Sequence, residues 1–251
     1  MSQMVMTQLP LPASASTSRL VRFLSQWVDG EAAATTPGFA ERLGQLFDLP
    51  DSIRISSALE TVPDAGFEPC GLSIDAVRNE FFNGRASLIR TALRTLSPGS
   101  GHARVRFPAE NTAATGSEAT DPEPYLVFYA VLQRDIEFRA RNLHAAIRQS
   151  VAGFSPSLAQ LCALDGALNE PLAANNRRLF GAIPGLLGKR FEFLVAQYRL
   201  IVPEGQHEPG LWAQSLATLR NDMRGLVLAE IETRLLPALG LIEALEEHTQ
   251  R

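Results

Sequence analysis

Apolar residues recur at helical spacing through most of the chain from residue 73 onwards. The spacing predicts one helix of about six turns that begins at Ser73 and ends at Ser97. A second begins near Pro122, and three more begin at further prolines, Pro156, Pro184 and Pro209. Because amphipathic helices bury their apolar stripes against one another, the sequence predicts an all-α fold, a bundle of long antiparallel helices.

The stripes also predict which side chains face inward. Leu161 is expected to do so in the helix after Pro156, and Ile201 in the helix after Pro184. Pro171 is expected to kink or restart its helix, whereas the last helix is expected to continue past Pro237.

Shorter patterns precede the bundle. Residues 18–62 are predicted to form a small N-terminal helical unit with helices over 18–29, 36–50 and 51–61. In the segment 51–61, Ile53 and Ile55 also alternate with polar residues as they would in a strand. Because the neighbouring segments are predicted to be helical, we favour a helix here too. Residues 1–17 are small, polar and proline-bearing, which predicts a disordered tail. The bundle itself is expected over 73–249.

Residues 97–124 do not fit a compact bundle. They contain four prolines and many small polar residues, which predicts a flexible loop that interrupts the bundle. Within the loop, the run HARVRF, which ends at Phe107, alternates in character. A short docking strand and a peptide-like anchor are both open for it.

Composition narrows the class of protein. The longest uninterrupted apolar run, Tyr125 to Leu132, is far shorter than the ~20 residues of a membrane-spanning helix, so no direct membrane insertion is expected. The net charge of −4 excludes a protein that is basic throughout, so a nucleic-acid surface would have to be a local patch. Cys70 and Cys162 belong to no CxxC pattern. The first residues lack the basic segment with which a signal peptide begins, so the cytoplasm is the expected compartment.

No catalytic motif is apparent. The run GAIPGLLGKRF fails as a P-loop because Ile183 stands where a glycine is needed and Arg190 follows the lysine. The sequence has neither GxSxG nor HExxH, and a lone helical histidine such as His144 is expected to be a surface or interface residue. Paired acids such as Glu230 with Glu232 are interpreted as solvated charge. We therefore expect a non-enzymatic protein with no cofactor and no metal.

Three arginines fall on apolar stripes. Arg78 and Arg85 share a stripe with Phe81, and Arg139 fills a core-type step between Ile136 and Leu143. A buried guanidinium is costly without a partner. Either each meets an internal acid, with candidates Glu80, Asp135 and Asp165, or the three line a groove for a binding partner.

Other cations form two candidate anion-binding surfaces. Arg134, Arg141 and Arg148 are spaced by seven residues and form a ridge on one helix face. A second cluster surrounds the predicted turn before Pro184 and consists of Arg177, Arg178, Lys189 and Arg190. Both could contact nucleic-acid phosphates, and both could equally be solvated faces. Glu137 favours the second interpretation because it stands four residues before Arg141.

Five stretches carry a family resemblance: RLVRFLSQW (19–27), FAERLGQLFDLPDSIRISSAL (39–59), RNEFFNGRASLIR (78–90), YLVFYAVLQRDIEFRARNLHAAIRQ (125–149) and RRLFGAIPGLLGKRFEFL (177–194). They resemble an uncharacterised bacterial family whose genes neighbour a MotA-like proton-channel protein and an OmpA-like peptidoglycan-binding protein. That arrangement is similar to the third type of the Zorya anti-phage defence system. The resemblance implies a cytosolic accessory protein that works with an ion-driven inner-membrane motor.

The leading hypothesis is therefore a non-enzymatic adaptor in phage defence that binds protein partners, such as motor subunits or other co-encoded proteins. The alternative is a DNA-binding sensor or effector that uses the arginine-rich surfaces.

Overall fold

The computed structural model describes residues 19–25, 27, 49–60, 71–97, 106–108, 121–203, 206 and 208–249. Within these residues the chain forms helices and no strand, so the prediction of an all-α fold is confirmed. The helices are α1 (Arg19–Ser25), α3 (Leu49–Glu60), α4 (Ile74–Thr95), α5 (Glu123–Ala152), α6 (Pro156–Gly181), α7 (Ile183–Ile201) and α8 (Pro209–Thr249).

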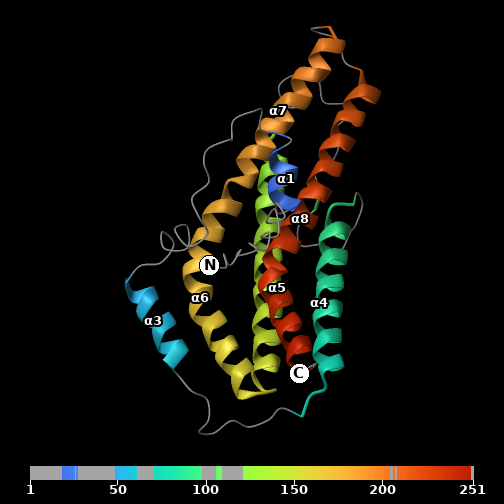
Figure 1. Cartoon of the computed structure of the whole chain (residues 1–251). Helices are drawn as coiled ribbons and strands as arrows, with labels where there is room; N and C mark the ends of the chain where they lie inside the picture. Colours follow the sequence, from blue (N-terminus) through green and yellow to red (C-terminus); the bar gives the residue numbers. More distant parts are fainter. Residues whose placement is uncertain are drawn as a thin grey trace, which may run out of the picture.

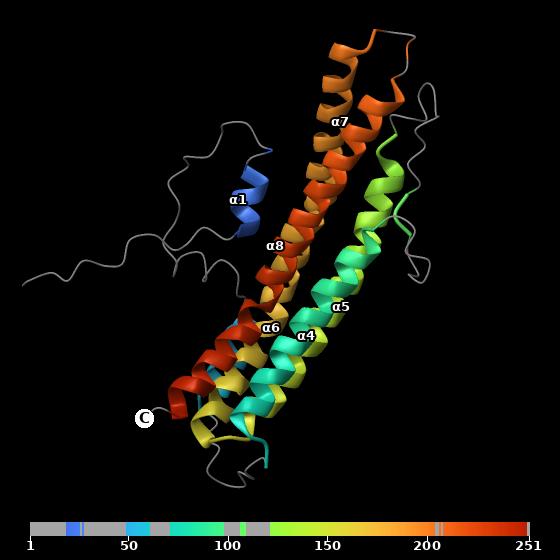
Figure 2. The same cartoon turned by 90° about the vertical axis from the view of Figure 1, so that its right-hand side faces the viewer.

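The long helices form an elongated up-and-down bundle (Figure 1). α4 and α5 run antiparallel to each other, and α6 and α7 follow one another in the same direction with a break at Ala182. α8 returns along the whole length of the molecule, beside α7 at one end and beside α4, α5 and α6 at the other (Figure 2). One continuous helix therefore holds both ends of the bundle together.

The ends of the predicted helices depend on local chemistry. The Ser73 Oγ accepts a hydrogen bond from the Ala76 N–H at 3.2 Å, and the Ser155 Oγ accepts one from the Leu158 N–H at 3.2 Å. Each serine satisfies a backbone donor that the first helical turn leaves without a partner. α6 continues through Pro171 and α8 continues through Pro237, so Pro171 does not restart its helix.

The predicted stripes form a continuous apolar core. Fully buried side chains come from α4, α5, α7 and α8, and the largest include Phe81, Tyr129, Phe191, Leu219 and Met223. Burial of this kind is the main stabilising term in a helical bundle.

Three inward-facing predictions are wrong. Leu161 is 37% exposed and Ile201 is 68% exposed. On α5 the Arg139 side chain is 46% exposed, and the small Ala140 beside it is buried instead. In each case the next residue along the chain is the buried one, namely Cys162, Val202 and Ala140, and spacing within one helix does not reveal this shift.

The N-terminal helices lie on different helices of the bundle. α1 contacts α8, where Arg19 pairs with Glu232 at 3.0 Å. α3 contacts α6, where the Gln160 Nε2 donates to the Leu59 carbonyl at 2.7 Å. Pro50 lies in the first turn of α3, so the helix predicted to begin at Asp51 begins two residues earlier, at Leu49. The predicted tail over 1–17 and most of the predicted helix over 36–50 lie outside the described residues.

Phe107 contacts the bundle core. Its ring meets Tyr125 and Phe128 edge to face, at centroid distances of 5.7 and 5.2 Å. The Arg220 guanidinium lies over the same ring, 5.0 Å from the ring centroid. Residues 106–108 form no strand, so the anchor is favoured for this part of the segment 97–124. None of the described helices is both long and apolar enough to cross a membrane.

Candidate functional site

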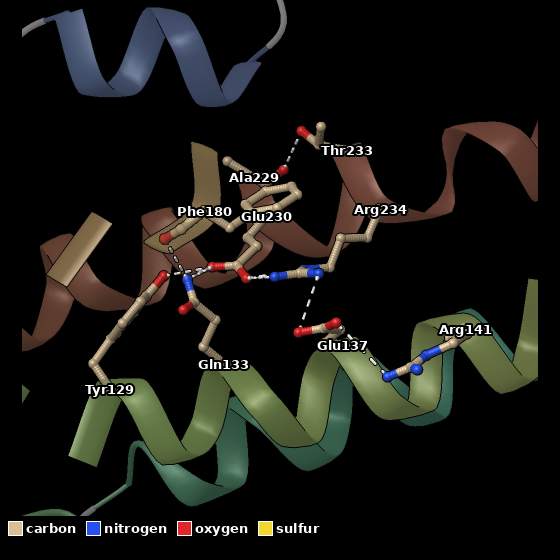
Figure 3. Close-up of polar contacts among 9 residues, drawn as sticks. All are labelled: Tyr129, Gln133, Glu137, Arg141, Phe180, Ala229, Glu230, Thr233 and Arg234. Carbon is tan, nitrogen blue, oxygen red and sulfur yellow. Dashed lines mark hydrogen bonds and ion pairs between the residues drawn. The ribbon is translucent and has the colours of Figure 1, made fainter. Parts of the chain in front are cut away.

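A glutamate lies at the centre of the bundle, where α5, the end of α6 and α8 meet. Glu230 of α8 is 0% exposed, which makes it the most deeply buried charged residue among those described. Figure 3 shows its carboxylate facing side chains of α5 and its own helix. Taking a carboxylate out of water costs several kcal/mol unless charges and hydrogen bonds compensate. The prediction that Glu230 is solvated is therefore wrong.

Both carboxylate oxygens of Glu230 accept hydrogen bonds. The Tyr129 hydroxyl and the Gln133 Nε2 donate to Oε2 at 2.9 and 3.1 Å. Arg234, one turn further along α8, donates from Nη2 and Nε to Oε1 at 2.7 and 2.9 Å. Gln133 also donates to the Phe180 carbonyl at 3.0 Å, which ties α6 to the same group. These hydrogen bonds connect the Glu230 carboxylate directly to side chains of α5 and α8, and through Gln133 to α6.

Arg234 is held from two sides. Its guanidinium lies 3.9 Å from the centroid of the Phe180 ring, a close cation–π contact. On the other side its Nη1 lies 4.0 Å from a Glu137 oxygen, and Glu137 pairs with Arg141 at 3.7 Å. The Arg141 side chain is 60% exposed, so a row of alternating charges leads from the core to the surface (Figure 3).

The hydroxyl of Tyr129 stays protonated in this setting. Burial raises the pKa of Tyr129 well above its ordinary value, and the Glu230 carboxylate raises it further. Since both causes disfavour the phenolate, Tyr129 acts as a fixed hydrogen-bond donor throughout the physiological pH range.

A second polar cluster joins α5 to α6. The Asp165 Oδ2 accepts from the Arg148 Nη1 at 3.1 Å, and the His144 Nε2 lies 2.9 Å from the same oxygen without the alignment of a hydrogen bond. His144 is buried where α5 packs against α6, so of the two expected settings, surface or interface, the structure excludes the surface. Burial and the Asp165 charge raise the pKa of the neighbouring Cys162 thiol to about 11, which leaves it protonated at neutral pH.

The three stripe arginines all meet carboxylates, at the edge of the core. Arg139 pairs with Asp135 at 2.7 Å, as one alternative anticipated. Arg78 lies 3.9 Å from Glu246 and Arg85 lies 3.9 Å from Glu232, and both acids belong to α8. The Arg78 and Arg85 side chains are 48% and 39% exposed, so neither is a buried cation.

The three arginines of the predicted ridge on α5 have different environments. Arg134 and Arg141 are exposed, whereas the Arg148 side chain is 26% exposed and pairs with Asp165 of α6. The second cluster is divided as well, because Arg190 pairs with Asp222 at 2.8 Å and contacts the Phe193 ring. Its other members are exposed at the junction of α6 and α7: Arg177, Arg178 and Lys189. The structure therefore does not gather the predicted cations into one surface.

A comparison with known protein families shows to which family the chain belongs. The model of a family described as a protein of unknown function, DUF3348, matches residues 6–247. The chain belongs to the DUF3348 family. No curated protein and no solved structure matches it.

The DUF3348 match includes the whole Glu230 network, which sequence reasoning missed. The sequence did contain one signal for this network. The apolar stripe of α8 passes through Met223 and Val227, and its next steps fall on Glu230 and Arg234, an acid and a base one turn apart. Within the described part of this DUF3348 chain, no three His, Cys, Asp or Glu side chains lie close enough together to hold a metal ion.

Proposed function

We propose that this DUF3348 protein is a non-enzymatic accessory component of a bacterial anti-phage defence system. In this proposal it resides in the cytoplasm, binds protein partners and acts with an ion-driven inner-membrane motor. The observation that carries the proposal is the resemblance of five stretches between residues 19 and 194 to a bacterial family whose genes neighbour motor genes.

The surface between α4 and α8 supports partner binding. Arg78 and Arg85 lie there, half exposed, at 3.9 Å from Glu246 and Glu232. These distances exceed a hydrogen bond, so the guanidinium N–H groups keep donors for an outside acceptor. A partner that presents carboxylates could take bidentate bonds from both arginines.

Deleting the gene while leaving its neighbours intact should abolish protection against phage, because the system would lose an essential component. The double variant Arg78→Glu, Arg85→Glu should raise the plaquing efficiency to that of the deletion strain, since like charges would repel an acidic partner. Plaque counts on the complemented strains measure both effects.

The matched control is Arg90→Glu, an exposed arginine on another face of α4, which should leave protection intact. Circular dichroism checks that each variant folds. Unchanged plaque counts after deletion would remove the proposed role in defence, and unchanged counts for the double variant alone would remove the α4–α8 surface.

DNA binding is the second candidate function, favoured by the junction of α6 and α7. Arg177, Arg178 and Lys189 are exposed there and pair with no other described residue. Two adjacent cations in the last turns of α6 and a third on the second turn of α7 could neutralise phosphates and release counterions.

If DNA binds at this junction, the triple variant Arg177→Glu, Arg178→Glu, Lys189→Glu should lose the mobility shift of a duplex in a gel. The binding constant of the unaltered protein should fall with salt, with a log–log slope of about −0.9 per phosphate contacted. Arg90→Glu on α4 is the control and should shift DNA as before. Absence of a shift at low salt would dismiss this candidate.

A further inference from the structure

α7 has one face in the core and one face in solvent. Leu187, Phe191 and Val195 are buried against the bundle. On the opposite side Phe193 and Leu200 are 50% and 84% exposed. Because the two are seven residues apart, they lie on one stripe about 10 Å apart along the helix. This is a large apolar exposure for a single rigid helix face.

Two opposite charges flank the same face. Glu192 and Arg199 are both exposed and also seven residues apart, too far to pair with each other. Neither forms an ion pair with another residue in the described part of the chain. With Val195, Ala196 and Leu200 they line an open depression of about 470 Å³. The face therefore offers one acid, one base and two apolar side chains.

The four side chains are arranged symmetrically about Ala196. Phe193 lies three residues before it and Leu200 four after it, while Glu192 lies four before it and Arg199 three after it. A helical turn is 3.6 residues, so the apolar pair falls on one side of Ala196 and the charged pair on the other. Such a pattern is complementary to itself when a second helix runs antiparallel.

We propose that this face of α7 binds a second copy of this chain as an antiparallel, two-fold symmetric helix pair centred on Ala196. In that pair Phe193 packs against Leu200 of the second copy, and Glu192 pairs with Arg199 of the second copy. Each contact occurs twice. The small side chain of Ala196 lets the two helices approach closely at the crossing point.

The charge pattern selects a second copy as the occupant. Both members of the ion pair and both members of the apolar pair are present on one helix at matched spacing, which an isologous contact requires. The proposal goes beyond the proposed function and does not depend on it.

Sedimentation velocity of the full chain over a range of concentrations tests the proposal. The unaltered chain should shift from monomer to dimer as concentration rises. Glu192→Arg and Arg199→Glu should each remain monomeric, because each places like charges opposite one another in the symmetric pair. An equimolar mixture of the two single variants should dimerise, since every pair across that interface is again of opposite sign. The double variant Glu192→Arg, Arg199→Glu should also dimerise.

Two further variants separate this contact from general effects of charge and folding. Glu243→Arg makes the same charge change on an exposed position near the far end of α8 and should leave dimerisation unaltered. Ala196→Trp should abolish it by keeping the helices apart, with the helical circular dichroism retained. A chain that is monomeric at every concentration, single variants that dimerise like the unaltered chain, or a mixture that stays monomeric would each overturn the proposal.

Discussion

Replacing Arg234 with leucine should lower the free energy of unfolding by about 3–5 kcal/mol, because it leaves a buried charge without its counter-ion. Glu230 is 0% exposed, and without Arg234 only the Tyr129 hydroxyl and the Gln133 amide still contact its carboxylate. Two neutral donors compensate a buried negative charge less than a guanidinium does. Urea denaturation followed by circular dichroism measures the loss.

The exposed end of the same network provides the control. Arg141→Leu removes a guanidinium whose side chain is 60% exposed and 3.7 Å from Glu137, so it should cost less than about 1 kcal/mol. The double variant Glu230→Gln, Arg234→Leu should recover part of the loss, since a neutral amide still accepts from Tyr129. Equal losses for Arg234→Leu and Arg141→Leu would show that the buried charge is not what matters.

The helices of this fold could be predicted from the sequence because their signals are local. Apolar spacing and the capping serines Ser73 and Ser155 lie within or beside the helix that they specify. The same information identifies Phe81 and Tyr129 as core residues. A stripe within one helix does not say which neighbour covers it, and Ile201 is exposed for that reason.

The candidate site could not be predicted in the same way because its contacts are not local. Tyr129 donates to Glu230 across 101 positions of sequence, and only the packing of α5 against α8 brings them together. The sequence favours solvated charge for the paired acids Glu230 and Glu232, whereas in the structure Glu230 and Arg234, one helical turn apart on α8, are buried together.

The predicted ridge on α5 fails for a related reason. Arg134 and Arg148 occupy equivalent positions in the seven-residue spacing, so sequence treats them alike. α6 packs against one end of α5 and brings Asp165 to Arg148, while Arg134 is exposed. The seven-residue spacing predicts that the arginines share one face of the helix. Contacts with neighbouring helices decide whether that face is exposed to solvent.

The second large effect is expected at Phe191, which joins α7 to the rest of the bundle. Its ring is 2% exposed and lies between Tyr125 of α5 and Trp212 of α8, at centroid distances of 5.6 and 6.1 Å. Phe191→Ala should lower the free energy of unfolding by about 3–5 kcal/mol, because it removes buried apolar area and leaves a cavity between three helices. Urea denaturation measures this loss as well.

Phe193 on the same helix is the matched control, since its ring is 50% exposed. Phe193→Ala should change the unfolding free energy of the monomer by no more than about 0.5 kcal/mol. It should nevertheless weaken self-association through α7, because the ring faces Leu200 of the second copy in the proposed pair. Phe191→Ala should have the opposite profile, with a large loss of stability and an intact dimer under conditions where the chain stays folded. Equal destabilisation by the two variants would contradict the assignment of one ring to the core and the other to the surface.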